Sequence, residues 1–285
     1  MAKLPISAII LTYNEELNIE DCLKSIALWV YEIIIVDSGS TDKTLQIVEK
    51  YTANIHQRKF VNQSEQFNWA LDNLRPQNDW ILRLDSDEIM LPETWEEIKE
   101  QFDKVTTEIT GFYMKRRVYF MERWIKHGGY YPAWFLRLWR RGAGRYEERA
   151  MDEHVVLSSG LTINLKNDFE EHDKKDLSIW IEKHNKYATR EAQAYIRESH
   201  RPEEHKIKEN RSGTDPEKRR WYKNHLYYKF PPFWRALLYW QYRYFIRLGF
   251  LDRVPGLVFH FLQGFWYRFL VDSKIYEMKK KASKK

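Results

Sequence analysis

The sequence has a single cysteine and lacks any long apolar run. Cys22 has no partner for an intrachain disulfide, so a fold held together by disulfides, common in small secreted proteins, is excluded. No stretch of about 20 residues is free of charged or strongly polar side chains, which argues against a membrane-spanning helix. With 285 residues, 43% of them hydrophobic and 31% charged, the composition is that of a globular protein with a large core.

The first residues, MAKLPISAIILTYNEE, also lack the small-residue cleavage site that a secretory signal peptide needs after its apolar run. We therefore expect this run to be the first buried strand of a cytoplasmic domain.

Charge is distributed unevenly along the chain. Residues 1–200 hold 27 Lys and Arg against 33 Asp and Glu, a net charge of −6, whereas residues 201–285 hold 20 against 8, a net charge of +12. Few large apolar residues occur in 199–220, and 19 of the 51 residues in 221–271 are aromatic. The pattern predicts a main domain over 1–198, a polar linker or loop over 199–220, and an amphipathic helical region with a basic tail over 221–285.

Apolar runs alternate with segments of helical periodicity in the first hundred residues. This alternation predicts an α/β fold in which helices cover a largely parallel sheet. Less regular strands at 111–121 and 133–141 extend it to a mixed sheet, and a long helix is expected at 176–198. The earlier strands are expected at 6–14, within 31–42 before its polar loop, at 53–58 and over the apolar run 80–84, with helices at 19–30, 44–51 and 64–74.

Three polar clusters follow three of these strands: TYNEE at 12–16, DSGSTD at 37–42 and DSDE at 85–88. Ligands of open α/β sheets bind beyond the carboxyl ends of the strands. We therefore expect the three clusters to form one site at one sheet edge.

The DSDE cluster places three carboxylates in four positions, directly after an apolar run. Carboxylates this close need a cation, and Asp85 and Asp87 are spaced to share a hard divalent ion, Mg²⁺ or Mn²⁺, together with substrate phosphates. Phosphohydrolases show a similar pair, but there it follows the first strand of the fold, whereas here it follows the fourth.

Taken together, the motifs ILTYNEE, IIVDSGSTD and LRLDSDE resemble those of the family 2 glycosyltransferases over about residues 5–175. The segment EEHDKKDLSIWIEKHNKYATREA and the aromatic carboxyl-terminal region are similar to the branch of lipopolysaccharide core β-1,4-glucosyltransferases. The resemblance implies a GT-A fold, a Rossmann-like mixed sheet that binds a nucleotide-diphosphate sugar, with UDP-hexose as the expected donor.

The resemblance also implies which residues hold the donor. Tyr13 would lie against the base, Asp37 would accept a hydrogen bond from the base or ribose, and Asp85 would face the ribose and diphosphate. For Arg83 a diphosphate contact and a simple ion pair with the acidic cluster remain open, and Gln66 and Asn68 face either the site or solvent. The full donor set is Thr12, Tyr13, Asn14, Glu15, Asp37, Ser38, Arg83, Asp85 and Ser86.

The family's metal ligand corresponds to Asp87, and His172 would complete the metal shell unless it has only a structural role. An inverting transfer also needs a general base that takes the proton of the acceptor hydroxyl. Glu153 matches that position best, and its neighbour Asp152 remains the alternative.

The segment between the donor motifs and this base is rich in arginine and aromatic residues. Arginines bind anionic groups and sugars stack on aromatic rings, so an acceptor surface is expected here, although scattered surface arginines would look the same. The expected acceptor residues are Arg116, Tyr131, Trp134 and Arg137.

The carboxyl-terminal region is too polar to span a bilayer and too apolar to be left in water. Trp and Tyr favour the headgroup zone, and arginines attract anionic lipid, so we expect helices that lie in the membrane interface. A helical hairpin packed on the catalytic domain and a dimer interface are the alternatives; the acidic main domain argues against nucleic acid. The arginines expected to face lipid are Arg235, Arg243, Arg247, Arg253 and Arg268.

The sequence therefore predicts an inverting, metal-dependent hexosyltransferase that acts on a lipid-linked saccharide or polyprenyl acceptor in cell-envelope polysaccharide assembly, from the inner face of the plasma membrane. Two alternatives are kept. One is a nucleotidyltransferase or phosphohydrolase that uses the same carboxylates, and the other is a non-catalytic membrane scaffold.

Overall fold

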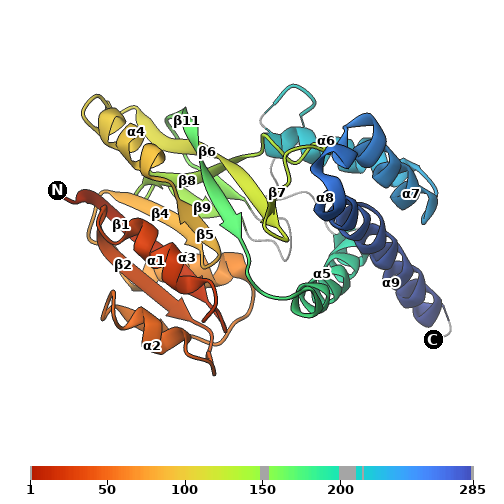
Figure 1. Ribbon diagram of the computed structural model, residues 1–285, viewed down its shortest axis with the longest axis horizontal. Coiled ribbons are helices and arrows are strands. Elements are labelled where there is room, and N and C mark those ends of the chain that lie inside the picture. The colour runs from red at the N-terminus through yellow and green to blue at the C-terminus, as the bar shows by residue number, and fades with distance from the viewer. Residues whose placement is uncertain (1, 148–153, 199–209, 214, 284–285) are drawn as a thin grey trace. The chain divides into compact units, whose positions relative to one another are not determined.

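The computed structural model describes residues 2–147, 154–198, 210–213 and 215–283 (Figure 1). These residues form two compact units. The sheet unit comprises the described residues of 1–119, 132–148 and 153–174, and the helical unit comprises those of 120–131 and 175–285. The sequence-predicted domain limits stay a prediction, and the predicted linker is not wholly irregular, because helix α6 begins at Asp215.

The sheet unit is built on one large mixed sheet with strand order β3-β2-β1-β4-β8-β6-β11-β5. Strands β3, β2, β1 and β4 are parallel, β8 runs antiparallel between β4 and β6, and β11 is parallel to β6. The strands are β1 (Leu4–Thr12), β2 (Val30–Asp37), β3 (Ile55–Gln57), β4 (Trp80–Asp85), β5 (Glu88–Met90), β6 (Ile109–Phe120), β8 (Trp134–Arg140) and β11 (Leu161–His172). A separate hairpin pairs β9 (Gly144–Tyr146) with β10 (Val155–Leu157).

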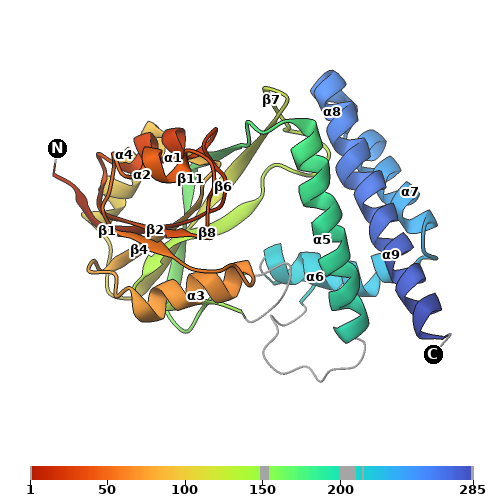
Figure 2. The same cartoon turned by 90° about the horizontal axis from the view of Figure 1, so that it is seen from below.

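Helices cover both faces of this sheet, as Figure 2 shows. Helices α1 (Ile19–Ile26), α2 (Thr44–Val48) and α4 (Pro92–Phe102) pack on one face, around buried Leu23, Val48 and Trp95. Helix α3 (Gln63–Asn73) packs on the other, with Phe67 in its core. Because both faces are buried, the central strands are apolar at nearly every position, which is the pattern seen in the sequence.

The parallel register brings the strand ends together. Thr12 at the end of β1 is the register partner of Asp37 at the end of β2, and Leu11 is the partner of Asp85 at the end of β4. The chain then turns into β5, where Glu88 pairs with Glu171 of β11. The three polar clusters therefore lie at one sheet edge, as predicted.

The helical unit contains the loop and strand β7 (Arg123–Trp124) of residues 120–131 and the helices that follow. Helices α5 and α9 run side by side (Figures 1 and 2) and enclose Ala188, Ala192, Tyr267 and Val271. The helices are α5 (Leu177–Glu198), α6 (Asp215–His225), η1 (Tyr227–Lys229), α7 (Trp234–Gln241), η2 (Tyr242–Ile246), η3 (Gly249–Asp252), α8 (Arg253–His260), η4 (Phe261–Trp266) and α9 (Tyr267–Ala282). The long helix predicted at 176–198 is confirmed.

Candidate active site

Asp37 organises the loop that follows β2. It is fully buried, and its Oδ1 accepts hydrogen bonds from the hydroxyls of Thr12 (3.0 Å) and Ser40 (2.5 Å). Its Oδ2 accepts from the backbone N–H groups of Gly39 and Ser40, both at 2.8 Å. Four donors fill the accepting positions of the carboxylate. Asp37 thus fixes the loop, and its expected contact with the donor nucleotide stays a prediction.

The loop after β1 is tied to the loop after β2. Asn14 has a left-handed backbone (φ 52°), its N–H donates to Ser40 Oγ at 2.9 Å, and its side-chain oxygen accepts from the N–H of Thr41 at 2.8 Å. The N–H of Glu15 donates to Thr44 Oγ1 at 2.7 Å. Tyr13 stays 57% exposed between these anchors. The two loops form a rigid rim that carries an exposed flat ring.

Asp85 is held from the side. Arg83 Nη2 donates to both carboxylate oxygens, at 2.6 and 2.8 Å, and Gln63 Nε2 donates to Oδ1 at 3.0 Å. Burial lowers the pKa of the Arg83 guanidinium, but the charges around it, Asp85 first and then Tyr146, Glu88 and Asp87, together hold that pKa above its ordinary value. Of the two roles left open for Arg83, the ion pair with the acidic cluster is the contact observed.

Glu88 lies fully buried beneath the turn. Its Oε2 accepts the N–H of Asp85 at 3.0 Å, and its Oε1 is bonded to Arg137 Nη2. Burial, and then the charge of Asp85, raise the pKa of the Glu88 carboxyl. Arg137 is itself only 3% exposed, and its guanidinium lies 5.1 Å from the ring of Phe169. Arg137 is therefore not part of an exposed acceptor surface, where the sequence placed it, because it supports the acidic turn from inside.

Asp87 and His172 are neighbours at the sheet edge. The N–H of His172 donates to the backbone oxygen of Asp87 at 2.8 Å, and the His172 ring stacks on Tyr119 at 5.2 Å. Ser86, between the carboxylates, is buried. Within the described ranges, no group of three or more His, Cys, Asp or Glu side chains is arranged to hold a metal ion. A metal here would draw two ligands from the protein and the others from substrate and water.

Polar residues of α3 complete the support. Gln66 is buried and donates to Ser38 Oγ at 2.9 Å, so it does reach the site. Asn68 is buried and exchanges two hydrogen bonds of 3.0 Å with the backbone of Tyr146, which anchors β9. The alternative of a solvent-facing position is wrong for both side chains.

Two residues at this edge carried no signal in the sequence. Asn18 donates to Glu15 (2.9 Å) and Asp173 (3.0 Å) and accepts the N–H of Lys174 (2.9 Å), which ties the end of β11 to the first loop. Cys22 Sγ lies 3.5 Å from the backbone oxygen of Asp85. Burial, followed by the charge of Glu88, raises the pKa of this thiol. The contacts of Asn18 with Asp173 and Lys174, and that of Cys22 with Asp85, join segments distant in sequence, so local sequence patterns could not predict them.

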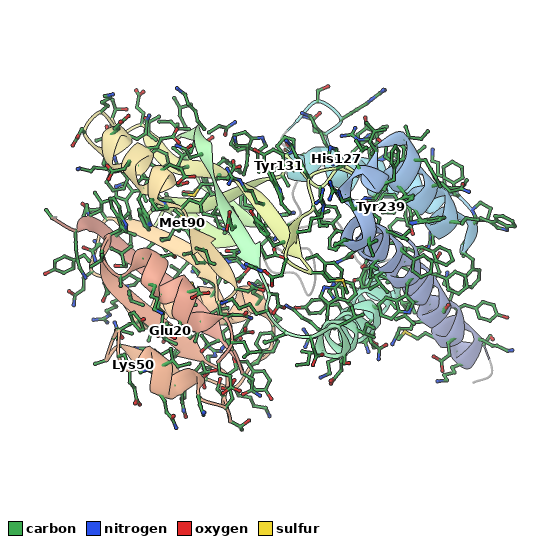
Figure 3. All side chains as sticks on the ribbon, in the orientation of Figure 1. Glu20, Lys50, Met90, His127, Tyr131 and Tyr239 are labelled. Carbon is green, nitrogen blue, oxygen red and sulfur yellow. The ribbon has the colours of Figure 1, made fainter. Side chains whose placement is uncertain are left out.

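The expected acceptor residues divide between the units. In the sheet unit, Arg116 pairs with Glu171 at 2.5 Å and lies over the ring of Phe135, and Trp134 faces Lys115 Nζ at 5.5 Å. Tyr131 belongs to the helical unit, on the same loop as His127 (Figure 3), and packs against Trp124. The base candidates Asp152 and Glu153 lie outside the described residues.

Comparison with known proteins identifies relatives. Residues 7–201 match the family model described as glycosyl transferase family 2. The lipopolysaccharide core biosynthesis glycosyltransferase LpsC of Rhizobium meliloti (strain 1021) is 29% identical over 211 residues, 72% of this chain and 77% of that protein. An uncharacterized glycosyltransferase of Rickettsia bellii (strain RML369-C) is 38% identical over 97 residues, 34% of this chain and 32% of that protein.

Solved structures show looser likeness. S. aureus TarS is 19% identical, with coverage of 69% of this chain and 41% of its own, at a TM-score of 0.40. The glucosyl-3-phosphoglycerate synthase from Mycobacterium tuberculosis, crystallised with Mn²⁺ and UDP-glucose, is 24% identical, with coverage of 40% and 43%, at a TM-score of 0.33.

Proposed function

The chain belongs to glycosyl transferase family 2, and we propose that it moves a hexose from a nucleotide-diphosphate sugar, with UDP-hexose as the expected donor, to a saccharide acceptor. Membership makes it a glycosyltransferase, and its mixed sheet with helices on both faces is in keeping with the predicted GT-A fold class. The observation that carries the proposal is the meeting of Thr12, Asp37 and Asp85 at one sheet edge, with Asp87 in the turn that follows.

The donor nucleotide would lie on the rim formed by the first two loops. Tyr13 is exposed and offers its ring to the base. The set of Thr12, Asn14, Glu15 and Ser38 lines the loops that Asp37 fixes. Asp85, already oriented by Arg83 and Gln63, would accept from the ribose, and Ser86 lies beside it.

Asp87 and His172 could bind Mg²⁺ or Mn²⁺ as protein ligands, because a carboxylate and an imidazole suit such ions when phosphate oxygens and water supply the other ligands. When bound, the ion would neutralise the charge that develops on the departing nucleoside diphosphate. The residues of this chain then have two tasks: Asp87 and His172 hold the diphosphate end of the site, and Glu88 with Arg137 keeps the turn in shape.

The acceptor reaction is proposed to invert the anomeric configuration. Glu153, or Asp152 next to it, would take the proton of the acceptor hydroxyl as that oxygen attacks the anomeric carbon. Arg116 and Trp134 of the sheet unit are proposed to hold the acceptor. The acceptor contact expected of Tyr131, in the helical unit, stays a separate prediction.

We further propose that the acceptor is lipid-linked and that the protein works at the inner face of the plasma membrane. The name of LpsC, which refers to lipopolysaccharide core biosynthesis, supports an envelope saccharide. Across the described part of the chain, no helix is long and apolar enough to cross a bilayer. Attachment is therefore proposed to be peripheral, through the basic, aromatic helical unit.

A panel of nucleotide sugars tests this function. Full-length protein is incubated with each donor, Mg²⁺ or Mn²⁺, and a lipid-linked or core saccharide, and the product is read by NMR. We expect metal-dependent release of nucleoside diphosphate and an inverted glycosidic bond. Release of sugar phosphate would favour the phosphohydrolase alternative, and no turnover of any donor would favour the scaffold. A retained bond would contradict the inverting mechanism.

A further inference from the structure

The helical unit contains a short segment whose apolar side chains face outward. Six of the ten residues in 245–254, here called the apolar turn, are large apolar residues that are 43–71% exposed. Single exposed apolar residues are ordinary, but a dense group marks a surface that meets another apolar phase. The six are Phe245, Ile246, Leu248, Phe250, Leu251 and Val254.

The backbone of the apolar turn adopts an energetically unfavourable conformation at two positions. Leu248 and Arg253 both have φ near +60°, in the left-handed region that side chains other than glycine disfavour. Other contacts must therefore stabilise this backbone conformation and offset its cost.

Buried polar contacts stabilise the backbone conformation of the turn. Asp252, 1% exposed, accepts the backbone N–H of His127 at 2.9 Å and contacts its ring Nδ1 at 2.6 Å. Arg243 Nε donates to the backbone oxygen of Gly128 at 2.8 Å. Gly249 has no room for a side chain, since a Cβ there would lie 2.6 Å from the ring of His260. The turn is thus fastened from inside, and its outer face is left apolar.

The exposed face continues beyond the turn. Phe245 lies 6.0 Å from Trp240, and Trp240 lies 6.1 Å from Phe261, by ring centroids. Phe261 and Phe265, and then Phe265 and Phe269, are each 5.5 Å apart. This row of rings joins the apolar turn to exposed side chains of η4 and α9, which makes one connected surface.

Cations outnumber carboxylates in the segment that forms this surface. From 218 to 276 the sequence contains only two carboxylates, Asp252 and Asp272, and both are buried. Arg247 and Arg253 are exposed within the turn itself, whereas the exposed carboxylates of the helical unit, such as Glu122, lie on other segments. An apolar turn that carries exposed cations and whose one carboxylate is buried matches the surface of an anionic bilayer.

Three of the arginines expected to face lipid do not. Arg235 is buried against Asp272, and Arg243 is buried against Gly128. Arg268 donates to Glu191 at 3.0 Å. Of the five arginines, Arg247 and Arg253 are therefore the two that can attract headgroups, and both lie within the apolar turn.

We propose that the apolar turn inserts into the interface of an anionic bilayer, with Arg247 and Arg253 at the headgroups, and so brings the enzyme to its membrane-bound acceptor. The proposal deepens the proposed function and rests on it for the acceptor alone. The occupant is the lipid bilayer, and the connected apolar face is its docking surface.

Flotation of the full-length protein with vesicles tests the proposal. Vesicles of equimolar phosphatidylcholine and phosphatidylglycerol are compared with vesicles of phosphatidylcholine alone. We expect Ile246→Asp and Val254→Asp each to lower the partition coefficient about tenfold or more, because an inserted aliphatic group becomes a carboxylate. Both side chains are about 70% exposed, so the fold tolerates the change. The matched control Leu28→Asp, at an equally exposed leucine of the sheet unit, should bind as the wild type does.

The cationic contribution is measured separately. Arg247→Gln and Arg253→Gln should each weaken binding about fivefold on vesicles with phosphatidylglycerol and little on those without it. Salt should weaken wild-type binding without abolishing it, since insertion is insensitive to screening.

Three results would overturn the proposal. The first is a wild-type protein that ignores anionic vesicles at low salt, and the second is an Ile246→Asp variant that floats as the wild type does. The third is a wild type that forms dimers which Ile246→Asp dissociates, with no vesicle binding by either, because the surface would then join two copies of the chain. Sugar transfer in solution is scored in parallel. Flotation without transfer in the wild type refutes the proposed function alone, and transfer without flotation refutes the insertion alone.

Discussion

The two units of this protein differ in the side chains that they leave at the surface. Both bury an ion pair, Glu88 with Arg137 in the sheet unit and Arg235 with Asp272 in the helical unit. The sheet unit gathers carboxylates at the sheet edge, where Arg83 pairs with Asp85, whereas the helical unit turns Ile246 and Val254 outward. The first arrangement suits chemistry on a charged donor, and the second suits a surface that is completed only by another phase.

This difference in surface composition follows from the secondary structure of each unit. Parallel strands end at a common edge, so polar groups can converge there and be held by loops, as Asp37 is. The short helices of the carboxyl-terminal region have no such edge. Arg235 reaches inward to Asp272 and Arg243 to the backbone oxygen of Gly128, while Ile246 and Val254 stay exposed.

The largest effect is expected where the donor site depends on one carboxylate. Asp87→Asn should abolish sugar transfer at saturating metal, since a lost metal contact removes several kcal/mol of transition-state stabilisation. The control is Asp79→Asn, because Asp79 is an exposed aspartate directly before β4, the strand that Asp87 follows. Transfer rates near wild type for Asp87→Asn would remove this residue from the metal site.

The acceptor side gives the next effect. Glu153→Gln should lower kcat by roughly 10²–10⁴-fold with little change in donor affinity, because only the proton acceptor is lost. Steady-state rates and donor titration separate the two quantities. If Asp152→Asn shows this loss and Glu153→Gln is near neutral, the base is Asp152.

In the helical unit the buried ion pair should dominate stability. Asp272→Asn leaves the Arg235 guanidinium buried without its carboxylate and should cost about 3–5 kcal/mol of unfolding free energy. Chemical denaturation followed by circular dichroism measures it. Glu277→Gln, five residues further along α9 on the surface, should leave the unfolding midpoint nearly unchanged. Equal midpoints for the two variants would show that the buried ion pair does not stabilise this unit.

The smallest effect concerns Cys22. Its pKa is raised, so the folded state favours the neutral thiol and loses stability as the pH rises above the ordinary value of about 9. Cys22→Ala should therefore show a flatter decline of melting temperature above that pH than the wild type. Parallel declines in the two proteins would mean that the thiol is not perturbed in the folded protein.

Local patterns predicted strands β1 to β4, β6 and β8 and helices α1 to α3 and α5, but not α4, β5 or β11. They also predicted the convergence of Thr12, Asp37 and Asp85, because parallel strands end at the same sheet edge. They failed where distant segments meet. Arg137 was expected on a rim, but β8 is inserted beside β4, which sends this arginine under Glu88. Arg235 and Arg243 were expected to face lipid, and the partners that bury them lie 37 and 115 residues away.

The division of labour between the units is tested most directly by one paired measurement on full-length protein: donor turnover in solution and flotation with equimolar phosphatidylcholine and phosphatidylglycerol vesicles, for Asp87→Asn and Ile246→Asp. We predict that Asp87→Asn floats as the wild type does and does not turn over donor, whereas Ile246→Asp turns over donor and does not float. A loss of both properties in either variant, with the fold intact by circular dichroism, would contradict the division.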